Sequence, residues 1–283
     1  MGRVTRRHPV LRLGPELAVQ RSDTLAVEEP LEIRLDGEAF LVTMRTPGDD
    51  VDLVHGLLHS EGIIATVEDV VAARYCEGAG PDGLNTYNVL DVALAPSATP
   101  PSVEQRRQVV TTSACGVCGT TSIDQVVRQS GHPLDAGLRV STDVISAAPD
   151  RLREQQKAFA KTGGLHAAGL MTADGALLAV REDVGRHNAV DKVVGWALRQ
   201  RMLPLGRLVL VVSGRASFEL TQKAVLAGLP MMVAVSAPSS LAAELATEAG
   251  LTLVGFVRGQ TMNVYSHPGR VATPVGVVAA ALG

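Results

Sequence analysis

The alternation of short aliphatic strands with helices between residues 141 and 257 most constrains the fold. The periodicity predicts strands at His166–Thr172, Ala176–Arg181, Arg207–Val212, Met231–Val235 and Leu251–Val257, and helices at 150–161, 187–200, 217–227 and Ser239–Ala249. Pro149 is expected near the first turn of the first helix, and glycines follow the helix ends. Short strands separated by helices predict a parallel or mixed sheet covered on both faces. The second half is therefore expected to be an α/β layer domain.

The first half has a different pattern and is expected to be a smaller α+β unit. Asp36-Gly37 lies between two alternating segments, 31–35 and 39–44, and this pair is typical of a β-hairpin. A helix is expected at 49–61, a short helix near 67–71 and a strand near 85–94, whereas the first thirty residues are mixed in polarity and are expected to be partly unpinned. The predicted domains are residues 1–140 and 141–283.

Composition excludes several classes of protein. The 283 residues are 46% hydrophobic, which is enough for a substantial core and excludes wholesale disorder. A net charge of −3 argues against broad binding to nucleic acids or membrane surfaces, which needs dense positive charge. No apolar stretch approaches the roughly 18–20 residues that span a bilayer, and Pro9 and Pro15 interrupt any secretory signal. We therefore expect a cytoplasmic protein.

The cysteine pair Cys115-Gly-Val-Cys118 is the sharpest local motif. With only Cys76 besides, the chain cannot form a disulfide framework, and an odd, low count fits a reducing compartment. Threonine, serine and glycine surround the pair, as in an exposed loop. Four interpretations remain open: half of a zinc site, a thioredoxin-like redox couple, a sulfur relay, or two inert thiols. Zinc is disfavoured because no second C-x-x-C motif supplies the remaining ligands.

Polar residues follow four successive strand ends in the second half. Arg186, His187 and Asn188 open one helix, with Asp191 and Lys192 one turn later. The next junctions are Ser213-Gly214-Arg215 and 236–240, and the last strand leads into 256–263. Strand ends and helix N-termini attract anions in α/β sheets. Together they favour one anion-lined crevice, although Ser217 also suits a helix cap and the charges of residues 181–192 also suit local salt bridges.

The chain contains four longer motifs: TTSACGVCG at 111–119, REDVGRHNAVDKVVG at 181–195, SGRASFELTQKA at 213–224 and AVSAPSSLAAELA at 234–246. Together these motifs resemble the FdhD family of sulfur carrier proteins. The resemblance covers most of the chain from about residue 20. It implies a cytidine-deaminase-like fold for the second half. Neither matching junction contains the cysteines that a zinc deaminase needs, so that activity is excluded.

The resemblance also implies a sulfurtransferase that acts through a cysteine persulfide. A cysteine desulfurase would supply sulfur, Cys115 would hold it, and Cys118 would assist. The acceptor would be the molybdenum bis-molybdopterin guanine dinucleotide cofactor (bis-MGD) that formate dehydrogenase needs, bound as a client cofactor by a homodimeric carrier without zinc. The implied cofactor site is the stretch Phe256, Val257, Arg258, Gly259, Gln260 and Thr261, and the polar strand ends add Arg186, Ser213, Gly214 and Arg215.

Two other functions stay open at this point. One is a non-catalytic chaperone that binds the cofactor of formate dehydrogenase, with incidental thiols. The other is a metal-stabilised hydrolase.

Overall fold

The computed structural model describes residues 4–15, 17–76, 86–101, 123–130, 134 and 137–273. The chain divides into two compact units. Unit 1 contains Met1–Thr121, Gln155–Ala168 and Arg181–Met202, and unit 2 contains Ser122–Glu154, Gly169–Val180 and Leu203–Gly283. Unit 1 thus takes residues from both sides of residue 140, where the sequence predicts a division into two continuous domains. That domain division stays a prediction.

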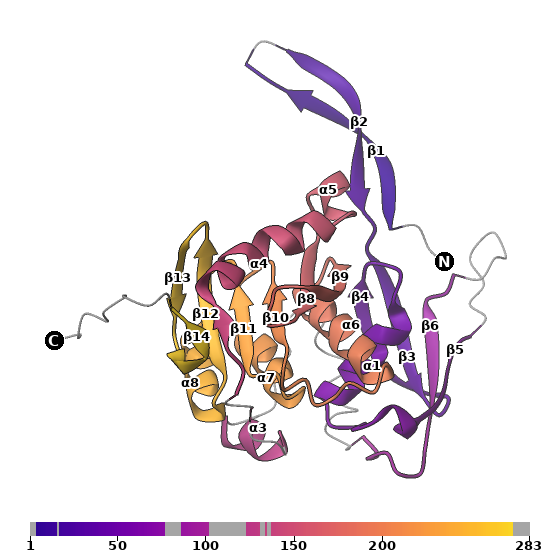
Figure 1. Ribbon diagram of the computed structural model, residues 1–283. Coiled ribbons are helices and arrows are strands. Elements are labelled where there is room, and N and C mark those ends of the chain that lie inside the picture. The colour runs from indigo at the N-terminus through magenta and orange to yellow at the C-terminus, as the bar shows by residue number, and fades with distance from the viewer. Residues whose placement is uncertain are drawn as a thin grey trace. The chain divides into compact units, whose positions relative to one another are not determined.

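Unit 1 is built around a four-stranded sheet in the order β4-β3-β6-β5 (Figure 1). The strands are β3 (Glu29–Leu35), β4 (Glu38–Arg45), β5 (Val70–Tyr75) and β6 (Val89–Leu94), with the short helix η1 (Val67–Asp69) before β5. The hairpin expected at Asp36-Gly37 is confirmed. These two residues have φ angles of 51° and 84°, the left-handed conformation that a two-residue hairpin turn needs. Leu31 and Ile33 alternate on the inner face of β3 and are fully buried.

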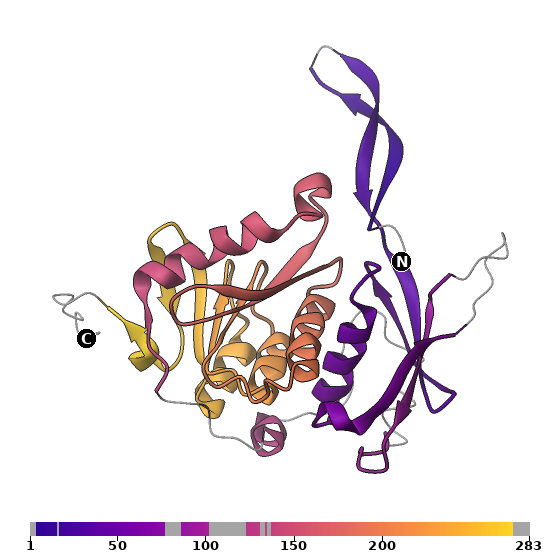
Figure 2. The same cartoon turned by 45° about the vertical axis from the view of Figure 1, so that its right-hand side comes forward.

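Helices α1 (Asp50–Ser60) and α6 (Arg186–Arg199) pack directly against each other in unit 1. Figures 1 and 2 show α1 between α6 and the four-stranded sheet. The contact depends on small residues because Gly56 of α1 and Gly195 of α6 each face backbone atoms of the other helix. Both helices were expected from apolar periodicity, and both are confirmed to within two residues.

The first residues of unit 1 form a long hairpin rather than the partly unpinned segment that their mixed polarity suggested. Strand β1 (Thr5–Leu13) pairs antiparallel with β2 (Ala18–Ala26) along their whole length. The apolar residues of this segment do not enter the core, which is why hydropathy alone gave little sign of the strands.

Unit 2 contains most of a six-stranded mixed sheet in the order β13-β12-β11-β10-β8-β9. The strands are β8 (His166–Met171), β9 (Leu177–Asp183), β10 (Val209–Val212), β11 (Met231–Ala234), β12 (Thr252–Arg258) and β13 (Thr261–Val264). β10, β11 and β12 run parallel, and β13 folds back antiparallel on β12. Every residue of β10 and β11 is buried, so the expected buried strands are confirmed.

Helices α7 (Phe218–Leu226) and α8 (Ser240–Ala249) connect the parallel strands and contact each other. Right-handed crossovers place both on one face of the sheet, while Figure 1 shows α4 (Thr142–Gln155) along the other face. The remaining elements are α3 (Ile123–Gln129), α5 (Phe159–Thr162), η2 (Pro268–Arg270) and the paired strands β7 (Val140–Ser141) and β14 (Val271–Ala272).

The helix expected at 150–161 was placed wrongly. The chain instead forms α4 from Thr142, with Pro149 inside it, and a separate short α5. Ser141 explains the earlier start, because its hydroxyl accepts a hydrogen bond from the Val144 amide at 3.3 Å. The preference of proline for a helix's first turn was therefore outweighed by a capping residue eight positions earlier.

Candidate functional site

The carboxyl ends of β10, β11 and β12 bring two of the predicted site segments together in unit 2. The Ser236 amide donates to the Gly214 carbonyl at 3.4 Å, and the Phe256 amide donates to the Ser236 carbonyl at 3.3 Å. The loops after β10 and β11 also pair, since the Ala216 amide donates to the Ala237 carbonyl at 3.2 Å. Two predicted segments, Ser213–Arg215 and Phe256–Thr261, therefore lie at the same end of the sheet, where the parallel strands have their carboxyl ends. We call this end the unit 2 edge.

The loop after β10 presents polar groups at this edge. Arg215 is exposed, and Ser213 and Gly214 are half-buried. Ser217 precedes α7 in the position of an N-cap, yet its hydroxyl makes no capping bond. Its Oγ is buried and has no hydrogen-bond partner in the structure. By contrast, Ser239 does cap α8, because its Oγ accepts from the Ala242 amide at 3.2 Å.

A buried hydroxyl without a partner is destabilising unless water or a ligand completes it. The sequence suggests two competing roles for Ser217, as part of a phosphate cradle with Ser213 and Arg215 and as a helix cap. The missing capping bond favours the ligand role, so Ser217 joins the candidate site residues. The sequence contained no signal to separate it from Ser239, because both serines stand directly before a helix.

The predicted stretch 256–261 forms the tip of the β12–β13 hairpin. Phe256 is 48% exposed and has a φ of 52°, in the left-handed region that a phenylalanine rarely adopts. The strand register shifts between Gly255 and Arg258, so Phe256 lies in a β-bulge. The side chains of Arg258, Gln260 and Thr261 are exposed, and Gly259 also has a positive φ. Val257 is 1% exposed, so its side chain belongs to the core and only its backbone could meet a ligand.

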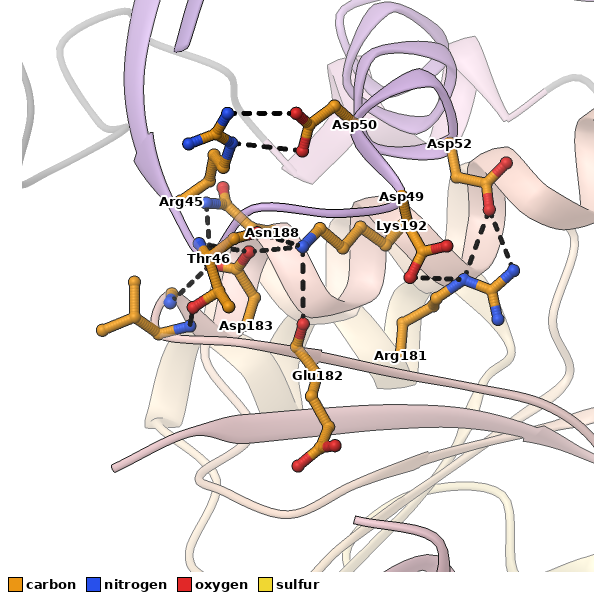
Figure 3. Close-up of polar contacts among 12 residues, drawn as sticks. Arg45, Thr46, Asp49, Asp50, Asp52, Arg181, Glu182, Asp183, Asn188 and Lys192 are labelled. Atoms are coloured by element: carbon orange, nitrogen blue, oxygen red, sulfur yellow. Dashed lines mark hydrogen bonds and ion pairs between the residues drawn. The ribbon is translucent and has the colours of Figure 1, made fainter. Parts of the chain in front are cut away.

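A buried polar cluster joins the start of α6 to the segment after β4 within unit 1 (Figure 3). Lys192 is 1% exposed, and its Nζ lies 2.7 Å from Asp183, whose side chain is fully buried. Lys192 also donates to the Thr46 carbonyl at 2.9 Å. The amide nitrogen of Asn188 donates to the Met44 carbonyl at 2.8 Å and to Asp183 at 3.1 Å.

The Asp183 carboxylate also accepts from the backbone amides of Thr46 and Gly185. Asn188 and Lys192 were candidates for contact with an anion on sequence grounds. Both are instead engaged in the interior of unit 1, so the salt-bridge interpretation describes this part of the segment.

Further ion pairs anchor the start of α1, and Figure 3 shows those of Arg45 with Asp50 and of Arg181 with Asp52. Arg45 is buried and contacts both carboxylate oxygens of Asp50 at 3.1 Å. Asp52 accepts from Arg181 at 2.9 Å and from Arg199 at 2.5 Å. These pairs fix the positions of α1 and α6, and burial beside Asp50 raises the pKa of Tyr75, which donates to that carboxylate.

Arg186 is the first residue of α6 and lies in unit 1. Its Nε is buried and has no hydrogen-bond partner. Burial lowers the pKa of His166, and the nearby positive charges of Arg186 and His187 lower it further. Three basic side chains therefore gather at this helix start, which carries no acidic residue in its first turn.

The cysteine pair Cys115 and Cys118 lies outside the described residues, as does the whole predicted loop 110–122. Cys76 is a free thiol of intermediate exposure after β5. Within the described ranges, no group of three or more His, Cys, Asp or Glu side chains is arranged to hold a metal ion. None of the helices in that part of the chain combines the length and apolar character needed to cross a membrane.

Comparison with known proteins relates the chain to one family along almost its whole length. Residues 26–272 match the FdhD/NarQ family. The chain is 60% identical over 271 residues to the sulfur carrier protein FdhD of Nocardia farcinica, covering 95% of this chain and 96% of that protein. Identity to the protein of the same name from Streptomyces coelicolor is 56%, covering 98% and 99%.

One solved structure has the same fold. It is that of a protein from Desulfotalea psychrophila described as a candidate formate dehydrogenase accessory protein. The two structures superpose with a TM-score of 0.75 at 23% sequence identity, covering 95% of this chain and 100% of the other.

Proposed function

Since this chain belongs to the FdhD/NarQ family, we propose that it is a sulfur carrier required for formate dehydrogenase. It accepts sulfur from a cysteine desulfurase and passes it to the bis-MGD cofactor of that enzyme. The names of the two relatives support the sulfur-carrying role. The observation that carries the proposal is the C-x-x-C pair in a chain whose unit 2 edge gathers Gly214, Ser236 and Phe256.

The proposed first step is a thiol exchange at Cys115. Its thiolate attacks the terminal sulfur of the donor's cysteine persulfide, a new S–S bond forms on Cys115, and the donor cysteine leaves as a thiolate. A thiolate is the required nucleophile because a neutral thiol attacks disulfide sulfur poorly. No electrons are gained or lost overall, since one S–S bond replaces another.

The proposed second step uses Cys118. Its thiolate attacks Sγ of Cys115, which releases the terminal sulfur as hydrosulfide and leaves a Cys115–Cys118 disulfide. The hydrosulfide becomes the sulfur ligand of the acceptor cofactor, and a dithiol reductant restores the pair. The spacing of two residues between the thiols suits this step, because C-x-x-C pairs readily form an internal disulfide.

The unit 2 edge is the proposed binding site for the guanine dinucleotide part of the substrate cofactor. Arg215 and Arg258 supply exposed guanidinium groups, which suit pyrophosphate oxygens. Phe256 supplies an exposed ring for stacking on a base. Ser217 supplies a buried hydroxyl without a partner. The strained backbone at Phe256 supports a ligand contact as well, since such strain concentrates at functional positions.

Arg186 lies in unit 1 and is proposed separately as a phosphate-binding group, supported by its buried Nε without a partner. We also propose the cytidine-deaminase-like arrangement for the second half, a homodimeric assembly and a cytoplasmic location, as the family resemblance implies. The parallel order β10–β11–β12 with its crossover helices supports the fold assignment.

Intact-mass measurement after incubation with a desulfurase and cysteine tests the sulfur step. The wild type is expected to gain one sulfur atom that a reductant removes, Cys118→Ala to retain it longer, and Cys115→Ala to gain none. Cys76→Ala is the matched control and should behave as wild type. A Cys115→Ala protein that still gains sulfur would overturn the assignment.

Binding of GDP, as a probe for the guanine end of the cofactor, tests the unit 2 edge. Arg215→Ala and Arg258→Ala are each expected to weaken GDP binding about 10-fold, the loss of one charge-assisted contact. Arg207→Ala is the control, because Arg207 is also exposed but precedes β10 at the opposite end of that strand. Equal affinities for GDP in all three variants would show that GDP does not bind at the unit 2 edge.

The same variants separate sulfur transfer from the chaperone alternative. If Cys115→Ala and Cys118→Ala leave formate dehydrogenase fully active in cells while Arg258→Ala does not, the protein is a non-catalytic cofactor carrier.

A further inference from the structure

The hairpin β1–β2 contributes few buried residues to unit 1. Every described residue from Leu11 to Asp23 is exposed. Among the described helices, α5 packs on β2 near the base of the hairpin. Figures 1 and 2 both show the two strands projecting beyond the rest of unit 1. We call residues 4–27 the arm.

A two-stranded hairpin surrounded by water has marginal stability, because neither face is covered. The arm nevertheless keeps an unbroken register from Thr5–Ala26 to Leu13–Ala18. A partner that covers one face would supply the missing stabilisation.

The two faces of the arm differ in chemistry. Strand alternation and the pairing of Leu11 with Gln20 and Leu13 with Ala18 place both leucines on one face. Leu11 is 60% exposed and Leu13 is 72% exposed, and Leu17 in the adjoining loop is 66% exposed. Exposed leucines in one cluster are characteristic of a protein-binding surface.

The opposite face of the arm carries three of its four arginines beside the exposed Val19 and Leu25. Arg12 and Arg21 lie on it with Arg6, since Arg12 pairs with Val19 and Val10 pairs with Arg21. The arm contains four arginines against two acidic residues, a net charge of +2. The whole chain has a net charge of −3, so the remainder carries −5. The arm is therefore attracted to a second copy of the same chain.

The available area also favours a second copy over a different protein. A nine-residue strand is about 30 Å long and the arm is about 10 Å wide, so docking one face buries roughly 600 Å² summed over both partners. That is within the range of incidental crystal contacts. Two arms exchanged about a two-fold axis bury roughly 1,200 Å², the lower limit of a stable interface.

We propose that the arm is a dimerisation element whose leucine face, Leu11 and Leu13, packs on a second copy of this chain in a mutual exchange. This inference rests on the homodimer proposed above but not on the sulfur chemistry. The arginines of the other face strengthen association at low salt by long-range attraction.

Sedimentation equilibrium of the full chain tests the proposal. The wild type is expected to be dimeric, and Leu11→Ser/Leu13→Ser is expected to raise the dissociation constant about 100-fold or more, because two buried leucines lose their contacts. Arg12→Glu/Arg21→Glu should also weaken the dimer, with a reduced salt dependence. The matched control is Leu178→Ser/Leu241→Ser, two leucines of unit 2 that are 42% and 41% exposed.

A wild-type protein that stays monomeric at about 100 µM would overturn both the dimer and the role of the arm. Contacts as weak as those between molecules in a crystal do not hold a dimer together at that concentration. Arm variants that dimerise as tightly as the controls would overturn the role of the arm alone, and sulfur loading by intact mass shows whether the sulfur chemistry is affected. Hydrogen exchange of wild-type residues 5–26 above and below the dissociation constant needs no variant. Protection only in the dimer supports the proposal, and equal exchange overturns it.

Discussion

Gly195 of α6 lies so close to Asp52 of α1 that a β-carbon added to it would fall 1.8 Å from the Asp52 carbonyl oxygen. A β-carbon on Gly56 would fall 1.9 Å from the Asp191 carbonyl oxygen. Real β-carbons do not approach other heavy atoms within 3.0 Å, and both neighbours are backbone atoms. The two helices can pack as they do only because neither position carries a side chain.

Gly195→Ala is therefore expected to lower the free energy of unfolding by about 3 kcal/mol, because α1 and α6 must separate and overpacking is costly. Urea unfolding monitored by circular dichroism measures the change. Gly269→Ala is the control, since a β-carbon there would meet nothing within 4 Å, and it should be nearly neutral. A Gly195→Ala protein as stable as the control would contradict the close helix contact.

Lys192→Met is expected to lower the free energy of unfolding by about 3–5 kcal/mol, because it leaves the Asp183 carboxylate buried without its charge partner. The same urea titration measures it. Arg201→Ala serves as the comparison, since the side chains of its ion pair with Glu68 are 72% and 58% exposed and solvent screens their attraction, so its loss should hardly change stability. Similar losses of unfolding free energy in the two variants would show that burial does not make the Lys192–Asp183 pair more important for stability.

The parts of the molecule that were predictable from the sequence are those fixed by local interactions. The Asp36-Gly37 turn and the strands of unit 2 follow from local pattern, because alternation and turn chemistry act over a few residues. The partners of Lys192 and Asn188 lie near Thr46, more than 140 positions away in the chain. No local pattern carries that information, so a helix start that looked like an anion site is largely part of the core.

The candidate site was predictable to a similar, partial extent. The sequence identified the polar strand ends of β10 and β12, and the parallel order of the strands brings them to one edge. It did not identify the bulge at Phe256, because a strand register shift depends on the β13 partner. It also could not distinguish Ser217 from Ser239, since the difference lies in hydroxyl orientation.

Ser217→Ala is expected to leave the free energy of unfolding unchanged or slightly raised, because the mutation removes a buried hydroxyl that has no partner. Ser239→Ala should instead lower it by about 1 kcal/mol through loss of the α8 cap. GDP titration of the same proteins is expected to show weakened binding only for Ser217→Ala. A Ser217→Ala protein that is less stable than Ser239→Ala would show that its hydroxyl does have a structural partner.

Phe256→Gly separates backbone strain from ligand contact. Glycine adopts the positive φ of 52° without penalty, so stability is expected to stay the same or rise by about 1 kcal/mol. Affinity for GDP should fall at least 5-fold with loss of the stacking ring. Phe256→Leu retains the strain and loses only the ring, so it should bind GDP as weakly as the glycine variant. Wild-type affinity in both proteins would remove Phe256 from the proposed site.

Stability is expected to fall in mild acid because of His55 on α1. His55 is 3% exposed, and its Nδ1–H donates to the Val51 carbonyl at 2.7 Å. Burial lowers its pKa from the ordinary value of 6.5, and the charge of Arg199 lowers it further, although the hydrogen bond to Val51 and the charge of Asp52 act in the opposite direction. The folded protein therefore holds the imidazole neutral in a range where the unfolded chain already binds a proton.

The sign of the effect follows from this difference in proton binding. The unfolded state takes up more protons as the pH falls below 6.5, so the free energy of unfolding decreases there and is fully restored above that pH. Urea midpoints between pH 8 and pH 5 measure the change. His55→Gln should show a smaller decrease than wild type, and the residual slope should include His166, whose pKa is lowered in the same direction. Identical slopes for wild type and His55→Gln would show that His55 is already able to accept a proton in the folded protein.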